Sequence, residues 1–216
     1  SVFDVVERRP EAVRLRLTDS AGPRAHYPFA FVFEVIVALA PATLSLAFEV
    51  RNVGRQPMPY ALGVHPAFPW PFDAASREGH AVEFAAPERA DVPLLTSDGL
   101  LQRRTRRLDL HGTQLALTRE LFGQGALVFL DAASASVTFV SPSGARITLA
   151  GEGFPHLALW TKPTAPFLSM EAWTGHADWE DGGGELGDRP SMRSLAQGAA
   201  ARHEVRMTYS AGPGGR

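Results

Sequence analysis

The chain has 216 residues, 45% of them apolar and 20% charged, with a formal net charge of −2. These values are typical of a globular protein with a sizeable core, and we expect one domain over residues 1–216. The weak charge argues against nucleic acid or an anionic membrane as a partner, and the absence of cysteine excludes disulfides and thiol catalysis. The longest apolar run, residues 29–42, contains Glu34 and is too short to cross a bilayer.

The first residues predict an exposed strand. The sequence opens with Ser1 and enters the apolar run 2–6 almost at once, whereas a natural N-terminus more often begins with a polar lead-in. We therefore expect residues to be missing before Ser1, and the strand over 2–6 to leave an open edge or apolar patch. No signal-peptide pattern is visible, which makes the cytoplasm the expected location.

A hydrophobic period of two runs through most of the chain and predicts antiparallel strands joined by short turns. No convincing helix, repeat or Gly-rich phosphate loop interrupts it. The fold class is therefore predicted as all-β, an antiparallel sandwich. The predicted strands cover residues 2–6, 12–18, 29–37, 44–50, 81–85, 126–130, 136–140, 145–149, 157–160, 167–173 and 205–209.

The middle of the chain is less regular. Residues 87–99 are predicted to form a loop, and an arginine cluster follows at 103–107. Because Leu108 and Leu110 come directly after that cluster, a solvated strand end or loop is favoured over an anion site.

A proline-rich stretch at 60–72 holds a histidine, His65, in one place. Pro66 and the prolines that follow it fix φ and remove backbone donors, which excludes a helix or a central strand here. The stretch must be a rigid, irregular connection that leaves a strand ending near Val64. A lone histidine beside proline is more often structural than catalytic, so a second feature is needed to decide its role.

That second feature is Glu171, a carboxylate within the apolar run 165–175. Side chains of a strand alternate between faces, so Ser169 and Glu171 share one face while Leu168 and Met170 share the other. If the latter pair faces the core, Glu171 points out of the sheet. A carboxylate among aromatic residues is costly unless it has a partner or a chemical role.

Other kinds of site find little support. His65, His156 and His176 lack a second histidine at metal-ligand spacing, so no metal is predicted. The Gly-x-Ser-x-Gly signature of a serine nucleophile does not occur.

Three segments resemble the aldose 1-epimerase (galactose mutarotase) family, most closely its short bacterial members. They are residues 58–68, 154–160 and 165–173, and they keep the order and spacing found in that family. The resemblance implies the galactose mutarotase-like supersandwich, a large antiparallel β-sandwich, in agreement with the strand pattern.

The resemblance also implies a chemistry. His65 matches the family's general acid and Glu171 its general base, which interconvert the α and β anomers of a free aldose without a metal or organic cofactor. Phe68, Trp160 and Trp173 are candidates to stack on the sugar, although each is individually more typical of packing. His65 and Glu171 are expected to face each other across an open cleft, about one pyranose ring apart. The expected partner is a small-molecule sugar, and the expected state is a monomer or homodimer.

Departures from the family pattern leave alternatives open. The upstream His-Gly segment and arginine of relatives are not in the given sequence, Gly125 stands where many relatives have an acidic residue, and Glu171-Ala-Trp replaces Glu-Pro-Trp. A non-catalytic carbohydrate-binding sandwich is therefore the rival hypothesis. A phosphorylated hexose is an alternative substrate, because of the arginines near residue 103.

Overall fold

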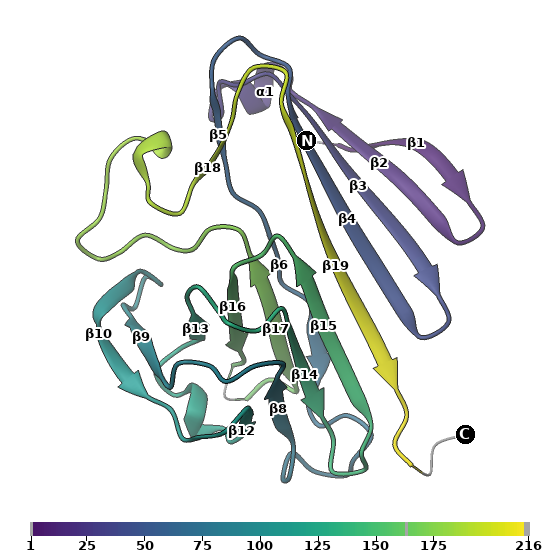
Figure 1. The fold of residues 1–216 in the computed structure, drawn as a ribbon, viewed down its shortest axis with the longest axis vertical. Helices are drawn as coiled ribbons and strands as arrows, with labels where there is room; N and C mark the ends of the chain where they lie inside the picture. The colour runs from purple at the N-terminus through teal and green to yellow at the C-terminus, as the bar shows by residue number, and fades with distance from the viewer. Residues whose placement is uncertain (1, 163, 214–216) are drawn as a thin grey trace.

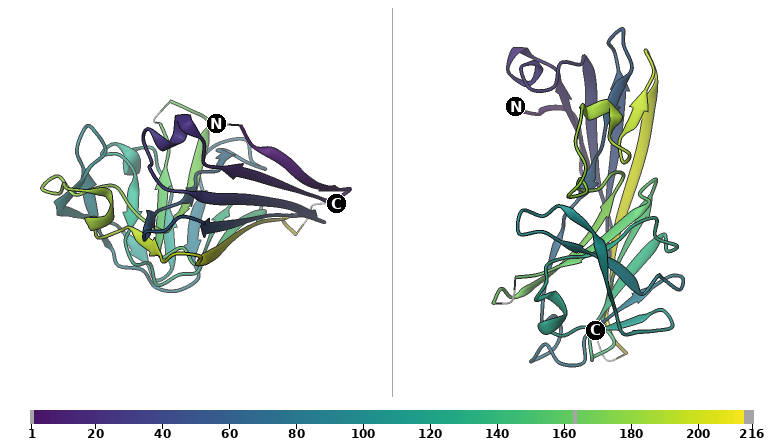
Figure 2. Two further views of the ribbon diagram at one scale, coloured as in Figure 1. Left: turned by 90° about the horizontal axis from the view of Figure 1, so that it is seen from above. Right: turned by 90° about the vertical axis from the view of Figure 1, so that its left-hand side faces the viewer.

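The computed structural model describes residues 2–162 and 164–213. Its largest sheet has ten antiparallel strands (Figure 1). The long strand β19 (Ala200–Ser210) lies between β4 (Thr43–Asn52) and β15 (Arg146–Glu152), and so joins the N-terminal strands to the rest of this sheet. In the side view of Figure 2, the N-terminal strands (purple to blue) occupy one end of the molecule, and most of the teal and green strands occupy the other. The strands, in spatial order, are β1 (Asp4–Arg9), β2 (Ala12–Thr18), β3 (Phe31–Ala40), β4 (Thr43–Asn52), β19 (Ala200–Ser210), β15 (Arg146–Glu152), β14 (Ser136–Val140), β8 (Ala81–Phe84), β12 (Gln114–Ala116) and β11 (Leu110–His111).

A second, smaller sheet packs against the lower half of the first and completes the sandwich. Buried Val82, Phe139 and Leu149 of the large sheet share one apolar core with Leu159 and Leu168 of the small sheet. The all-β sandwich prediction is therefore confirmed. The strands of the small sheet are β13 (Leu127–Phe129), β16 (His156–Trp160), β17 (Phe167–Trp173) and β6 (Gly63–Val64), and β7 (Ala67–Pro69) also pairs with β17.

In the described part of the chain, two strand pairs and three short helices lie outside these sheets. None of the helices among the described residues has the length and apolarity needed to cross a membrane. The pairs are β5 (Met58–Tyr60) with β18 (Arg193–Leu195) and β9 (Asp91–Leu95) with β10 (Leu101–Arg107). The helices are α1 (Ala21–Arg24), η1 (Glu120–Phe122) and η2 (Leu186–Asp188).

The structure corrects two local expectations. Residues 87–99 are not all loop, because β9 forms there and pairs with the arginine-rich β10. Pro93 is tolerated in β9 because the strand belongs to a two-stranded pair with an irregular register. The sequence also shows no convincing helix, yet the single turn of α1 forms between β2 and β3.

The exposed edge predicted at the N-terminal end of the chain is present, although its strand β1 covers Asp4–Arg9 rather than residues 2–6. β1 is the terminal strand of the large sheet and pairs only with β2 among the described residues. Val2 and Val5 are 87% and 52% exposed, which gives this edge an apolar surface.

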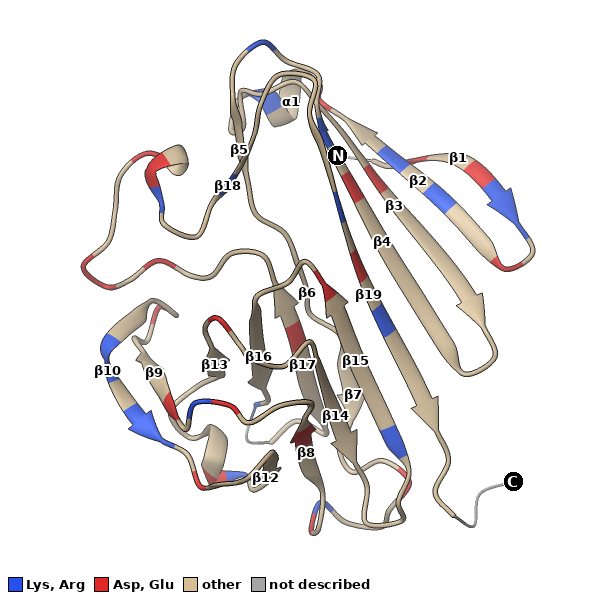
Figure 3. Ribbon diagram, viewed as in Figure 1, with Lys and Arg blue, Asp and Glu red and all other residues tan. Residues whose placement is uncertain are grey.

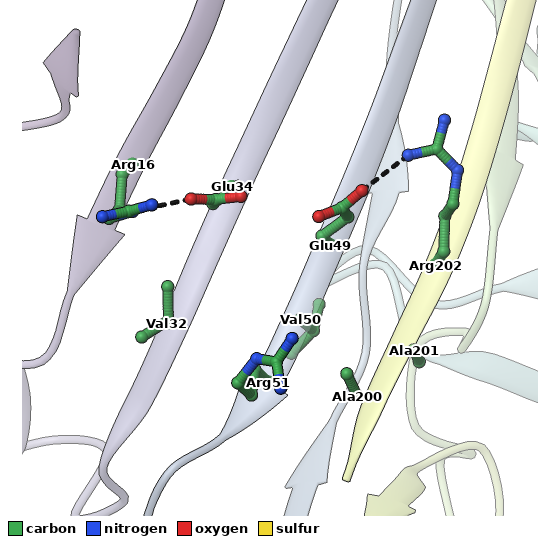
Figure 4. A pocket seen from close by; sticks show the side chains of 9 residues that line it. All are labelled: Arg16, Val32, Glu34, Glu49, Val50, Arg51, Ala200, Ala201 and Arg202. Carbon is green, nitrogen blue, oxygen red and sulfur yellow. Dashed lines mark hydrogen bonds and ion pairs between the residues drawn. The ribbon is translucent and has the colours of Figure 1, made fainter. Parts of the chain in front are cut away.

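A ladder of charges crosses the sheet from β2 to β19, and Figures 3 and 4 show it. Glu34 and Glu49 are direct cross-strand neighbours, an arrangement that is repulsive by itself. Arg16 contacts Glu34 at 2.6 Å and Arg202 contacts Glu49 at 2.7 Å, while Arg14 reaches both carboxylates. Burial alone would raise the pKa of Glu34, but the two arginines outweigh it and lower that pKa. The hollow that these side chains line (Figure 4) therefore contains carboxylates that are already paired with arginines.

A buried histidine in β19, His203, has a partner within hydrogen-bond distance at each ring nitrogen. His203 Nε2 lies 3.0 Å from the Tyr60 hydroxyl, and Nδ1 lies 3.2 Å from the Gly153 carbonyl oxygen. Since a carbonyl only accepts, Nδ1 carries the proton and the Tyr60 hydroxyl donates to Nε2, so the neutral ring is satisfied at both nitrogens. Burial lowers the pKa of His203, and burial likewise lowers the pKa of His156 in β16.

We therefore expect the protein to lose stability in mild acid. A histidine whose pKa is lower in the folded state binds its proton more readily when unfolded, so stability falls as pH drops through the unfolded pKa of about 6.5. Between about pH 7.5 and about pH 5.5 the free energy of unfolding should fall by on the order of 1 kcal/mol, and Tm by about 2–4 °C. Thermal unfolding of the parent and of His203→Gln tests this. An equal pH slope in both proteins would exclude a contribution from His203.

Candidate functional site

Glu171 lies near the middle of β17, a central strand of the small sheet. Its cross-strand neighbour is Ala158 of β16. Leu168 and Met170 are fully buried in the apolar core, while Ser169 and Glu171 lie on the opposite face. The division of faces that the sequence predicts is therefore confirmed.

His65 is held beside Glu171 by the strands on either side of it. β6 ends at Val64, which pairs with Ala172, and β7 begins at Ala67, which pairs with Ser169. Residues 65 and 66 thus form a short break between two segments that both pair with β17. The Pro66 carbonyl accepts a hydrogen bond from Met170 N at 3.3 Å, which secures this break against the strand.

The two predicted catalytic side chains are in direct contact. His65 Nε2 lies 3.0 Å from Glu171 Oε1. The other ring nitrogen, Nδ1, lies 2.8 Å from Ser169 Oγ, and that hydroxyl donates to the Pro66 carbonyl at 2.9 Å. With its hydrogen directed to Pro66, the Ser169 hydroxyl accepts from Nδ1–H. Nε2 is therefore the ring nitrogen that faces the Glu171 carboxyl group.

The environments of the two groups differ sharply. The His65 side chain is 57% exposed, whereas that of Glu171 is only 4% exposed. Burial raises the pKa of Glu171, although the neighbouring His65 acts in the opposite direction. A carboxylate with a raised pKa beside an accessible imidazole can exchange protons with a bound molecule.

Two expectations about this pair are wrong. Glu171 is on the predicted face of β17, but it is buried rather than open to solvent, because His65 lies against it. The side chains are also 3.0 Å apart rather than one pyranose ring apart. Both differences arise because the segments flanking His65 pair directly with β17.

The structure brings two of the three predicted aromatic residues to this face. Trp160 pairs with Ser169, and its ring meets the His65 ring edge-on at 5.7 Å between centroids. Trp173 lies on the same face, two residues beyond Glu171. Phe68 does not join them, because it pairs with Leu168 and packs against the apolar core.

Comparison with known proteins identifies the family. The family model described as Aldose 1-epimerase matches residues 1–184. The chain belongs to the aldose 1-epimerase family. It is similar to the chromosomal and plasmid forms of protein LacX from Lactococcus lactis subsp. lactis, each 29% identical over 199 residues, covering 89% of this chain and 67% of the relative.

Solved structures resemble this member of the aldose 1-epimerase family over nearly its whole length. A galactose mutarotase related enzyme from Lactobacillus acidophilus superimposes with a TM-score of 0.85 at 25% identity, covering 99% of this chain and 73% of that one. A galactose mutarotase-like protein from Lactobacillus casei superimposes with a TM-score of 0.86 at 24% identity, covering 96% and 73%. These likenesses support the galactose mutarotase-like supersandwich predicted from the sequence.

Ser169 is the contact that sequence reasoning missed in this aldose 1-epimerase family member. Its position two residues before Glu171 places it on the same strand face, which was a usable signal. Its bond to His65 depends on how β7 pairs with β17, and that pairing is not visible in the sequence. No cluster of three or more potential metal ligands occurs in the described ranges 2–162 and 164–213.

Gly63 in β6 is required by the close approach of Trp173. A Cβ at this position would lie 2.6 Å from Trp173 Cδ1 and 3.0 Å from the Ala172 carbonyl oxygen. The second atom is backbone and cannot move aside easily, so the indole and the strand must both shift.

Gly63→Ala should therefore destabilise the protein by about 1–3 kcal/mol and displace the indole beside Glu171. Denaturant unfolding and tryptophan fluorescence measure the two effects. Gly183→Ala is the matched control, because a Cβ at Gly183 meets nothing within 4 Å. Equal stability of both alanine variants would contradict the packing argument.

Proposed function

We propose that this chain is a mutarotase that interconverts the α and β anomers of an aldose by general acid–base catalysis. The observation that supports this most strongly is the contact between the exposed imidazole of His65 and the buried carboxylate of Glu171 at 3.0 Å. A protein that only binds sugar has no need for an acid and a base in direct contact. Membership of the aldose 1-epimerase family supports the same reaction class.

The short separation suits this reaction. The two oxygens that exchange protons, the C1 hydroxyl and the ring oxygen, are both bonded to C1, so the acid and base must act close together rather than across the ring. Glu171 accepts the proton of the C1 hydroxyl while His65, as imidazolium, donates one from Nε2 to the ring oxygen. The C1–O5 bond breaks and C1 becomes the aldehyde carbon.

Reclosure reverses both transfers. Rotation about the C1–C2 bond presents the other face of the aldehyde to the C5 hydroxyl. His65 takes the proton of that hydroxyl as the ring closes, and Glu171 returns its proton to the C1 oxygen. Both groups end in their starting states, and the reaction is redox-neutral.

Neighbouring residues would support the two catalytic groups. Ser169 acts on His65 Nδ1, so that the transferable proton is confined to Nε2. Trp160 offers an aromatic surface next to the imidazole, suited to the apolar face of a pyranose.

Polarimetry tests the function directly. Freshly dissolved α-D-glucose and α-D-galactose should reach their equilibrium rotation faster with the protein than in a buffer blank. A rate equal to the blank for every aldose tried would favour a binding protein.

The pH dependence provides a further test. Glu171 must be deprotonated to act as base, and burial raises its pKa, so activity should fall as pH drops through a value above the ordinary glutamate pKa of about 4.3. We expect the acid limb of kcat/KM to lie at a higher pH than an exposed glutamate would give. A profile that stays flat down to about pH 4.3 would contradict the role of Glu171 as base.

A further inference from the structure

One cavity is lined in part by Trp160, the residue whose ring contacts His65 of the proposed catalytic pair. It has a volume of about 630 Å³ and lies between the β9–β10 hairpin and the segment that precedes β13. The polar groups in its wall include Thr96, Gln102 and Gln124, and Trp160 lines it as well. Since the Trp160 ring is also 5.7 Å from the His65 ring, this indole borders both the cavity and the proposed catalytic pair.

Arg104 of β10 is the one charged residue among those described that line this cavity. Gly125 forms part of the opposite wall with φ +94°, a backbone conformation that disfavours a side chain. The wall therefore carries a positive charge without a carboxylate.

The neighbouring arginines of β10 are engaged elsewhere (Figure 3 shows the strand's basic stretches). Arg103 pairs with Asp181 at 3.2 Å and lies over the Trp179 ring, and Arg107 pairs with Asp91 at 3.1 Å. Arg106 donates to the Leu121 carbonyl at 2.8 Å and so secures the segment that carries the opposite wall.

Arg104 differs because its partner in the described residues is neutral. Its Nη2 donates to Gln102 Oε1 at 3.0 Å, and Gln102 Nε2 in turn donates to Glu180 Oε2 at 2.9 Å. The second bond fixes the amide so that its oxygen faces Arg104. The guanidinium is thereby held at the cavity while its other N–H groups stay available to an anion.

We propose that this cavity binds an anionic substituent of the sugar, a phosphate or a carboxylate, through Arg104. The anomeric carbon would lie at His65 and Glu171, the pyranose ring along Trp160, and the anionic group in the cavity. Arginine matches both phosphate and carboxylate oxygens by paired N–H donors. The inference rests on the proposed mutarotase function, whose substrate it narrows.

The test compares the parent with Arg104→Gln, which keeps a polar side chain and removes the charge. Substrates are a hexose 6-phosphate, a hexuronate and the corresponding neutral hexose, followed by NMR exchange between the anomers. We expect kcat/KM for the preferred anionic sugar to fall by about 10–100-fold, the loss of one charged hydrogen-bonding partner, and that for the neutral hexose by less than about 2-fold. Arg107→Gln removes a surface arginine of the same strand and should change neither.

Binding is measured in parallel by calorimetry, which separates this inference from the function it rests on. Both anionic sugars are titrated into the parent and Arg104→Gln, and the tighter ligand decides between phosphate and carboxylate. If Arg104→Gln binds the anionic sugars more weakly than the parent does, the anion site is supported even when no sugar is turned over. In that case the mutarotase proposal fails and the anion site stands. Equal affinity of the anionic sugars for both proteins would overturn the anion site while leaving mutarotation intact. An equal fall in kcat/KM for neutral and anionic sugars would do the same.

Discussion

Replacing Glu171 by Gln should lower kcat for anomer exchange by roughly two to four orders of magnitude while the fold stays intact. The amide has nearly the same shape as the carboxylate and can still contact His65 Nε2, but it cannot accept the proton of the C1 hydroxyl. Because the side chain is buried and has a raised pKa, removing its charge should cost little stability. Mutarotation kinetics and thermal unfolding measure the two properties separately.

Glu152→Gln is the matched control for that variant. Glu152 is the last residue of the strand β15, and its side chain is exposed. Full activity in Glu152→Gln together with the loss in Glu171→Gln would assign the effect to the site. A Glu171→Gln variant as active as the parent would remove Glu171 from the chemistry.

His65→Asn should produce a loss of similar size from the acid side of the reaction. Asparagine is short, and its amide can take the place of Nδ1 beside Ser169, but it has no group at the position of Nε2 that can donate a proton to the ring oxygen. Since the His65 side chain is 57% exposed, the substitution should change Tm little. Initial rates over a range of substrate concentrations should show the loss mainly in kcat.

His111→Asn is a suitable control for His65→Asn, because His111 is an exposed histidine of β11. Retained activity in His65→Asn would show that another group, or water, supplies the proton. That outcome would leave the carboxylate as the one catalytic group and would contradict the paired mechanism.

The sheet structure could be predicted because most strands carry their own signal. Strands such as β4 and β14 alternate or concentrate apolar residues in the pattern that burial of one or both faces requires. β9 escaped prediction because Pro93 argues against a strand, and only its pairing with β10 makes room for that residue. Local patterns contain no information on such a partner.

The site was predictable in its residues but not in its spacing. Alternation along β17 identifies the face that carries Glu171, since it depends only on neighbouring residues. The distance from Glu171 to His65 depends on β6 and β7 pairing with β17, a contact between segments about a hundred residues apart in the chain. The same pairing turns Phe68 toward the core, because its register sets Phe68 beside Leu168.

The most direct test of the paired mechanism is the double variant His65→Asn/Glu171→Gln, measured for anomer exchange beside the two single variants. If the two groups act as one acid–base unit, losing the second costs little once the first is gone. We expect the double variant to lie within about threefold of the slower single variant, with all three folded. A double variant slower by the product of the two single losses would contradict the paired mechanism, because it would show that each group acts independently.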